Sequence, residues 1–93
     1  MVNHNGEKMF LKKDKIVIRD MGDEAVLYNP QTKAIHVLNK TSSMVWEYCD
    51  GKHSLEMIEN KIMGKFNVSN VQDVKDDIRE TINQFSQLGL VEQ

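Results

Sequence analysis

The side chains that could do chemistry are few. The usual candidates for metal binding or nucleophilic catalysis are three histidines, His4, His36 and His53, and a single cysteine, Cys49. None stands at a metal-ligand spacing, and the sequence has no glycine-rich phosphate loop and no nucleophile elbow. Cys49 falls on the apolar side of a predicted helix, which favours a buried thiol over a nucleophile. We therefore expect a protein that is not an enzyme and that holds no cofactor and no metal.

Four carboxylates gather on one predicted helix, at Asp73, Asp76, Asp77 and Glu80. Like charges three or four residues apart on a helix cost about a few tenths of a kcal/mol per pair. The helix dipole offsets this repulsion only in the first turn. Two interpretations stay open, a solvated face and an acidic lip that receives a basic peptide. The same charges count against a DNA recognition helix, because they repel phosphate.

The predicted strand Ala34-Ile35-His36-Val37-Leu38 has apolar side chains on both faces. One face must cover the helices, so the other face is left exposed. An apolar edge strand with no Pro and no central Lys tends to pair with another chain unless its own chain covers it. A covered strand and a docking edge therefore both stay open. We interpret His36, the only polar side chain of the strand, as an ordinary surface residue.

Three predicted strands precede the helix that carries the carboxylates. They span Lys15–Asp20, Glu24–Asn29 and Ala34–Leu38, and all are rich in residues that suit a half-buried pleated surface. Residues 21–23 form a turn between the first two, and Asn29-Pro30 opens a connection of about five residues between the last two. We expect a three-stranded antiparallel meander, which needs a layer of helices packed on it.

Three predicted helices follow the strands. Their expected bounds are Lys40–Cys49, capped by Asn39 or Thr41, then Ser54 to about Phe66, and Ser69 to Leu88. The last helix has the most regular apolar stripe, which comprises Val71, Val74, Ile78, Ile82, Phe85 and Leu88. Gly89 is expected to end it, and Leu90-Val91 to close over a core centred on Trp46.

Length and composition indicate one small domain. The chain has 93 residues, a net charge of −2 and no apolar run long enough to cross a membrane. A single cysteine forms no internal disulfide, which fits a reducing, cytoplasmic setting. We expect most of residues 1–13 to form a flexible arm, with docking of Met9-Phe10-Leu11 at the end of the sheet left open, and residues 14–93 to form the domain. Strands followed by helices predict an α+β fold, and this order also describes a winged helix-turn-helix.

The segments AVLYNPQTKAIHVLNKTSSMVWEYCDGKHSLEMI and KFNVSNVQDVKDDIRETINQFSQLGLV together resemble the PqqD-like family. The likeness covers roughly residues 11–91 and depends on the order of several features, none of which is diagnostic alone. These features are Leu38-Asn39-Lys40-Thr41, the helix end from Trp46 to Cys49-Asp50-Gly51, the Ile58 helix, and the Asp77-Ile78 helix that closes in Leu88-Gly89-Leu90.

That family is the RiPP recognition element, a small winged-helix-like domain that binds the leader segment of a ribosomally made precursor peptide. The resemblance implies that the leader adds as a strand to residues 34–38, beside the last helix, and is presented to a modifying enzyme, often a radical SAM protein. It implies a peptide-binding set of Ala34, Ile35, His36, Val37, Leu38, Val74, Asp77, Ile78 and Thr81. The connection Tyr-Asn-Pro-Gln-Thr-Lys departs from the shorter Tyr-Pro-Glu-Gly-type turn of members that serve pyrroloquinoline quinone synthesis. We therefore do not assign that pathway.

Two other functions stay open beside this peptide chaperone. A winged-helix DNA-binding transcriptional regulator would bind duplex DNA through the last helix, which its carboxylates disfavour. A structural module would dimerise through the same strand edge. Our first hypothesis has a precursor peptide and a modifying enzyme as partners, no nucleic acid and no membrane, and a chain that is a monomer or a weak homodimer.

Overall fold

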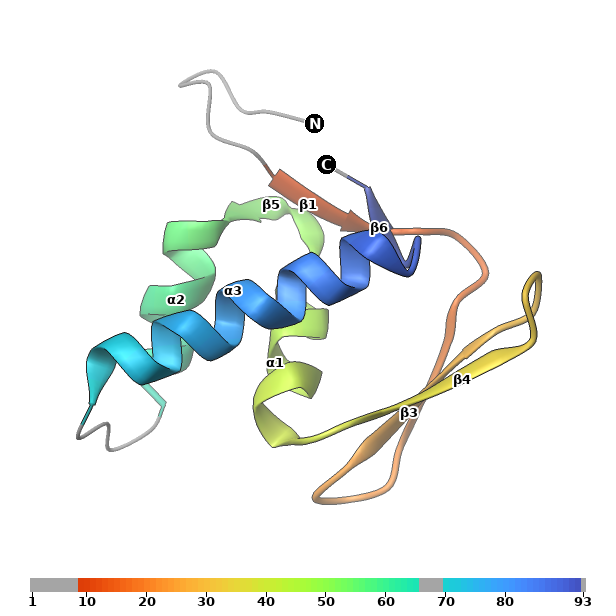
Figure 1. Ribbon diagram of the computed structural model, residues 1–93, viewed down its shortest axis with the longest axis horizontal. Coiled ribbons are helices and arrows are strands. Elements are labelled where there is room, and N and C mark those ends of the chain that lie inside the picture. Colours follow the sequence, from red (N-terminus) through yellow and green to blue (C-terminus); the bar gives the residue numbers. More distant parts are fainter. Residues whose placement is uncertain (1–8, 66–69, 93) are drawn as a thin grey trace.

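The fold is α+β, with two small antiparallel sheets and three helices (Figure 1). The computed structural model describes residues 9–65 and 70–92. The helices lie together, and the sheet that contains β3 and β4 extends to one side of them (Figure 1). The winged helix-turn-helix description stays a prediction.

The predicted meander is present as the first sheet. Its strands are β2 (Val17–Asp20), β3 (Ala25–Asn29) and β4 (Ala34–Leu38), in the order β2-β3-β4. At the turn after β3, the side-chain Oδ1 of Asn29 accepts a hydrogen bond from the Gln31 N–H at 3.0 Å. The Asn29 carbonyl oxygen accepts a second one from the Lys33 N–H at 2.7 Å. This local bonding fixes the register of β4 on β3.

A second sheet joins three distant parts of the chain, and the sequence did not predict it. It has the order β5-β1-β6, formed by β5 (Asp50–Ser54), β1 (Met9–Lys12) and β6 (Val91–Glu92). Met9 and Phe10 are buried. The expectation of a flexible arm was therefore wrong for Met9–Lys12, because burial of these apolar side chains and pairing on both sides hold them in place. Residues 1–8 lie outside the described part of the chain.

The three helices are capped by side chains. They are α1 (Lys40–Tyr48), α2 (Leu55–Met63) and α3 (Val71–Gln87), with N-caps Asn39, Ser54 and Asn70. Each cap oxygen accepts a hydrogen bond from a backbone N–H of the first turn, which satisfies a donor that has no partner inside the helix. Asn70 caps α3 in place of the expected Ser69, which lies outside the described residues together with Phe66. No helix in the described ranges is both long and apolar enough to cross a bilayer.

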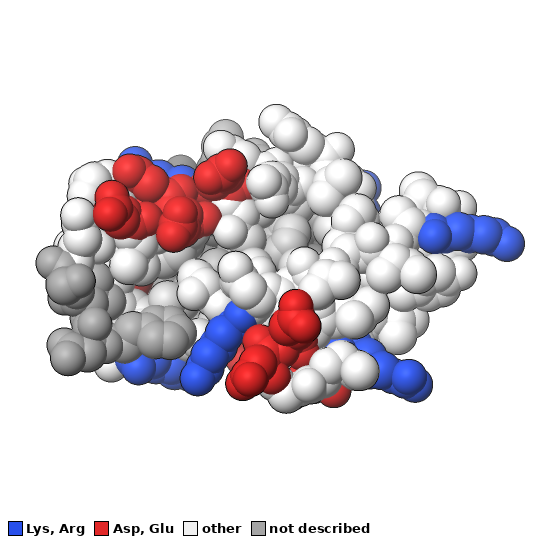
Figure 2. Space-filling model, turned by 60° about the horizontal axis from the view of Figure 1, so that its bottom comes forward, with Lys and Arg blue, Asp and Glu red and all other residues white. Residues whose placement is uncertain are grey.

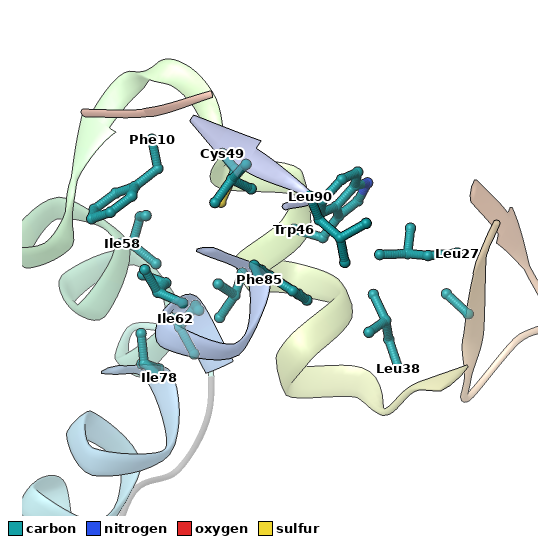
Figure 3. Close-up of a cluster of buried hydrophobic side chains, with 14 residues drawn as sticks. Phe10, Leu27, Leu38, Trp46, Cys49, Ile58, Ile62, Ile78, Phe85 and Leu90 are labelled. Atoms are coloured by element: carbon teal, nitrogen blue, oxygen red, sulfur yellow. The ribbon is translucent and has the colours of Figure 1, made fainter. Parts of the chain in front are cut away.

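The core joins the inner face of the first sheet to the helices (Figure 3). Trp46 lies in it as predicted, in a T-shaped contact with Phe85 at 5.4 Å between ring centroids. Leu27 and Leu38 reach the same cluster from the sheet, and Leu90 closes it from the C-terminal segment. The stripe of α3 is buried from Ile78 to Phe85, whereas its expected end members Val71 and Leu88 are exposed. These two residues lie at the ends of the helix, beyond the elements that cover its middle.

Gly89 follows α3 with a φ of +72°, a left-handed conformation that a Cβ disfavours. We expect Gly89→Ala to lower the free energy of unfolding by about 1–2 kcal/mol. Gly64, which ends α2, has an ordinary φ of −69°, so it is a matched control. A Cβ there would contact the Asn60 carbonyl oxygen at 3.4 Å, and Gly64→Ala should stabilise the protein by about 0.4–1 kcal/mol. Urea denaturation measures the free energy of unfolding of both variants. Equal effects would contradict the left-handed conformation assigned to Gly89.

Candidate functional site

Strand β4 has one free edge. It pairs with β3 along its whole length, and within residues 9–65 and 70–92 no strand pairs with its other side. Strand β1, which belongs to the segment expected as an arm, lies in the other sheet and leaves this edge open. A row of unpaired backbone N–H and C=O groups can accept a further strand.

The two faces of β4 differ in exposure. Ile35 pairs with Tyr28 and Val37 with Val26, which puts these four side chains on one outer face. Ile35 is 65% exposed and Val37 is 63% exposed. On the inner face Leu38 is buried, while Ala34 and His36 are half-buried. The chain thus covers one face of the strand, and among the described residues it leaves the other face exposed and the second edge unpaired, so the docking edge stays a prediction.

A cleft of about 280 Å³ continues from the end of β4 to α3. It starts at Asn39, which follows the last residue of β4, and its lining side chains are all polar or acidic. On α3 these side chains recur at helical spacing and so share one side of the helix. The lining residues are Asn39, Thr41, Asp77, Glu80, Thr81 and Gln84.

Some of the predicted site residues line the cleft, and others do not. Asp77 and Thr81 line it, and the Thr81 hydroxyl donates a hydrogen bond to the Asp77 carbonyl oxygen at 2.8 Å. Val74 is half-buried against the core, and Ile78 is fully buried within it. The side chain of Ile78 therefore has no surface to offer a peptide, and its part in the site is to hold α3 in place.

Sequence reasoning left four lining residues out of the peptide-binding set. Glu80 and Gln84 lie three and seven positions after Asp77, a spacing that signals the same side of a helix. Asn39 and Thr41 were considered only as helix caps. Asn39 does cap α1, since its Oδ1 accepts a hydrogen bond from the Ser42 N–H at 2.8 Å.

Charge is divided between two sides of α3. The four predicted carboxylates are all exposed, and Figure 2 shows acidic side chains gathered in a patch on the face that it displays. On another side of the helix, the Arg79 Nε donates to Oε2 of the buried Glu59 on α2 at 3.1 Å. This ion pair links α3 to α2 and leaves Arg79 outside the residues that line the cleft.

Two reactive side chains of the described residues, Cys49 and His53, do not line the cleft. Burial raises the pKa of Cys49 to about 12; the neighbouring Lys12 lowers it and Asp50 raises it further, both by smaller amounts. His53, expected in a turn, lies in β5, and its Nδ1 is 2.8 Å from Oδ1 of Asp50. Among the described residues no group of three or more His, Cys, Asp or Glu side chains is placed to hold a metal ion.

A protein-family model matches most of the chain. The family model described as coenzyme PQQ synthesis protein D (PqqD) matches residues 24–91, which include the β3–β4 hairpin and all three helices. No curated protein matches the chain in sequence.

Solved structures share the fold. TbiB1 in complex with the TbiA(beta) leader peptide is 24% identical, with a TM-score of 0.75, over 88% of this chain and 94% of that one. A lasso peptide synthetase B1 complexed with the leader peptide is 16% identical, with a TM-score of 0.76, over 92% of this chain and all of that one (100%). The heterocyclase TruD is 14% identical, with a TM-score of 0.61, over 89% of this chain but only 11% of that one.

The burial of Cys49 predicts an unreactive thiol. Since the thiolate is the reactive form, a pKa near 12 in place of 9.0 leaves about a thousandfold less thiolate at pH 8. Alkylation by iodoacetamide at this pH should be slower than that of a free cysteine by at least this factor. The rate, followed by mass spectrometry, should recover in urea above the unfolding midpoint. Rapid alkylation of the folded protein would contradict the burial of this thiol.

Proposed function

Because the chain belongs to the family of coenzyme PQQ synthesis protein D (PqqD), we propose that it captures the leader segment of a ribosomally made precursor peptide by strand addition. The observation that carries the proposal is the free edge of β4 beside the cleft on α3. TbiB1 and the lasso peptide synthetase B1, which share the fold, are both described with a bound leader peptide, and this supports the same role here.

Backbone pairing supplies only part of the binding free energy. Four or five ladder hydrogen bonds along β4 contribute about 2–7 kcal/mol, at about 0.5–1.5 kcal/mol each. A micromolar complex needs about 8 kcal/mol, in addition to the cost of ordering a flexible peptide. Side chains at the cleft and on the outer face must therefore add to the affinity, which is how strand addition gains specificity.

The bound leader is presented to a modifying enzyme in this proposal, and the chain itself does no catalysis. The heterocyclase TruD supports a link to such enzymes, because the same fold corresponds to a small part of that chain. The family resemblance implies a radical SAM enzyme as one class of partner. We place the protein in the cytoplasm, where precursor peptides are made.

An NMR titration tests the proposal. The neighbouring genes are searched for a short precursor reading frame, and its leader peptide is synthesised as the probe and added to the isotope-labelled protein. Amide shifts should concentrate at β4 and at residues 39–41 and 77–84, because these segments form the free edge and the cleft. Shifts confined to the second sheet, or no shifts at all, would contradict the proposal.

The two rival functions serve as controls for this titration. Duplex DNA at low salt should leave the same amides unshifted, because the exposed carboxylates of α3 repel phosphate. Sedimentation over a range of concentrations separates strand addition from dimerisation through the same edge. If a dimer forms, the leader peptide should dissociate it, since both would use β4.

A further inference from the structure

The cleft beside β4 is polar throughout, and this determines what a bound strand can direct into it. Its lining offers amide and hydroxyl groups and two carboxylates, Asp77 and Glu80, but no apolar and no basic side chain. Burying an apolar peptide side chain there would desolvate these polar groups without giving them partners. A cationic side chain would instead donate hydrogen bonds to their oxygens and neutralise the charge of the two carboxylates.

The apolar surface lies on the other face of the same strand. Ile35 and Val37 are the most exposed aliphatic side chains of the sheet, and they stand on the strand with the open edge. A strand added to β4 places side chains directly beside them, since opposite residues of neighbouring strands share a face. Apolar side chains at these positions would cover Ile35 and Val37.

We infer that the segment bound by β4 alternates, with apolar β-branched or aromatic side chains outward beside Ile35 and Val37 and a Lys or Arg side chain inward at Asp77 and Glu80. The inference rests on the proposed strand addition and specifies its substrate. It agrees with the acidic lip that the sequence left open on α3, and it assigns the apolar side chains of the peptide to the outer face of β4. The reason is that Ile78 and Val74 are turned into the core, so acidic and polar residues remain at the cleft.

Synthetic peptides test the alternation. One labelled peptide alternates Val and Lys, a second has the same composition in two blocks, and a third alternates Val and Glu. We expect the alternating Val-Lys peptide to bind with about tenfold higher affinity than either control, as measured by fluorescence anisotropy. The peptide with one Val block and one Lys block has the same charge, but as a strand it cannot place all Val side chains on one face and all Lys side chains on the other. Equal affinities for the two Val-Lys peptides would overturn the inference.

Protein variants test the inward contact. Asp77→Asn/Glu80→Gln should weaken the alternating Val-Lys peptide about fivefold and reduce the salt dependence of its binding. Asp73→Asn/Asp76→Asn makes the same change in net charge on α3 at residues that do not line the cleft. This control should weaken binding much less. Equal losses would mean that only the overall charge of the helix matters, which would contradict the inward contact.

Two further variants test the outward contact. Val37→Thr keeps a β-branched side chain but removes apolar surface at the free edge, so it should weaken the peptide about threefold. Val17, which is 52% exposed on the same face, lies on β2 at the far side of the sheet, so Val17→Thr should have no effect. Equal effects of the two substitutions would contradict the contact.

Failure of the inference is distinguishable from failure of the proposed function. If the natural leader shifts the β4 amides but the alternating Val-Lys peptide binds no better than its controls, strand addition stands and the alternation is wrong. If neither the leader nor any of the peptides shifts these amides, the proposed function itself is wrong. Circular dichroism of each variant confirms that a loss of binding is not a loss of fold.

Discussion

The packing of one sheet face against the helices determines the rest of the structure. Ala25, Leu27 and Leu38 bury the inner face of the β2-β3-β4 sheet in the cluster that contains Trp46 and Phe85 (Figure 3). This burial packs the inner face of β4 against the core, and pairing with β3 fixes one of its edges. The strand is therefore ordered, and no strand in the described part of the chain pairs with its second edge, which is the preformed template that the proposed strand addition needs.

Helix α3 combines two roles that occupy different sides. Its middle buries Ile78, Ile82 and Phe85 in the core, which fixes the helix along its length. The Arg79–Glu59 ion pair adds a link to α2 and gives the buried Glu59 carboxylate a charged partner. On the side that remains, Asp77 and Glu80 line the cleft. The repulsion among these carboxylates costs some helix stability, and a cationic ligand would relieve it.

Much of the fold could be predicted because it depends on local residues. The Asn29 turn, the Ser54 cap and the Gly89 stop each act within a few positions, and the meander and helices followed from them. The second sheet could not be predicted, since its strands are short and pair across most of the chain. For the site, the edge strand and Asp77 could be predicted from residue types. The apolar stripe of α3 already predicted that Ile78 is buried. Ile78 was nevertheless included in the peptide-binding set because the family resemblance implied it.

The sheet β5-β1-β6 has a consequence for how the chain folds. Leu11 pairs with Glu92, so the core is closed only by residues near the end of the sequence. Leu90 is fully buried and must pack into the core before Trp46 and Phe85 are shielded from water. A growing polypeptide on the ribosome would therefore keep its apolar interior exposed until synthesis had passed residue 91. Such long-range closure slows folding, because a large loop must form before its contacts are made.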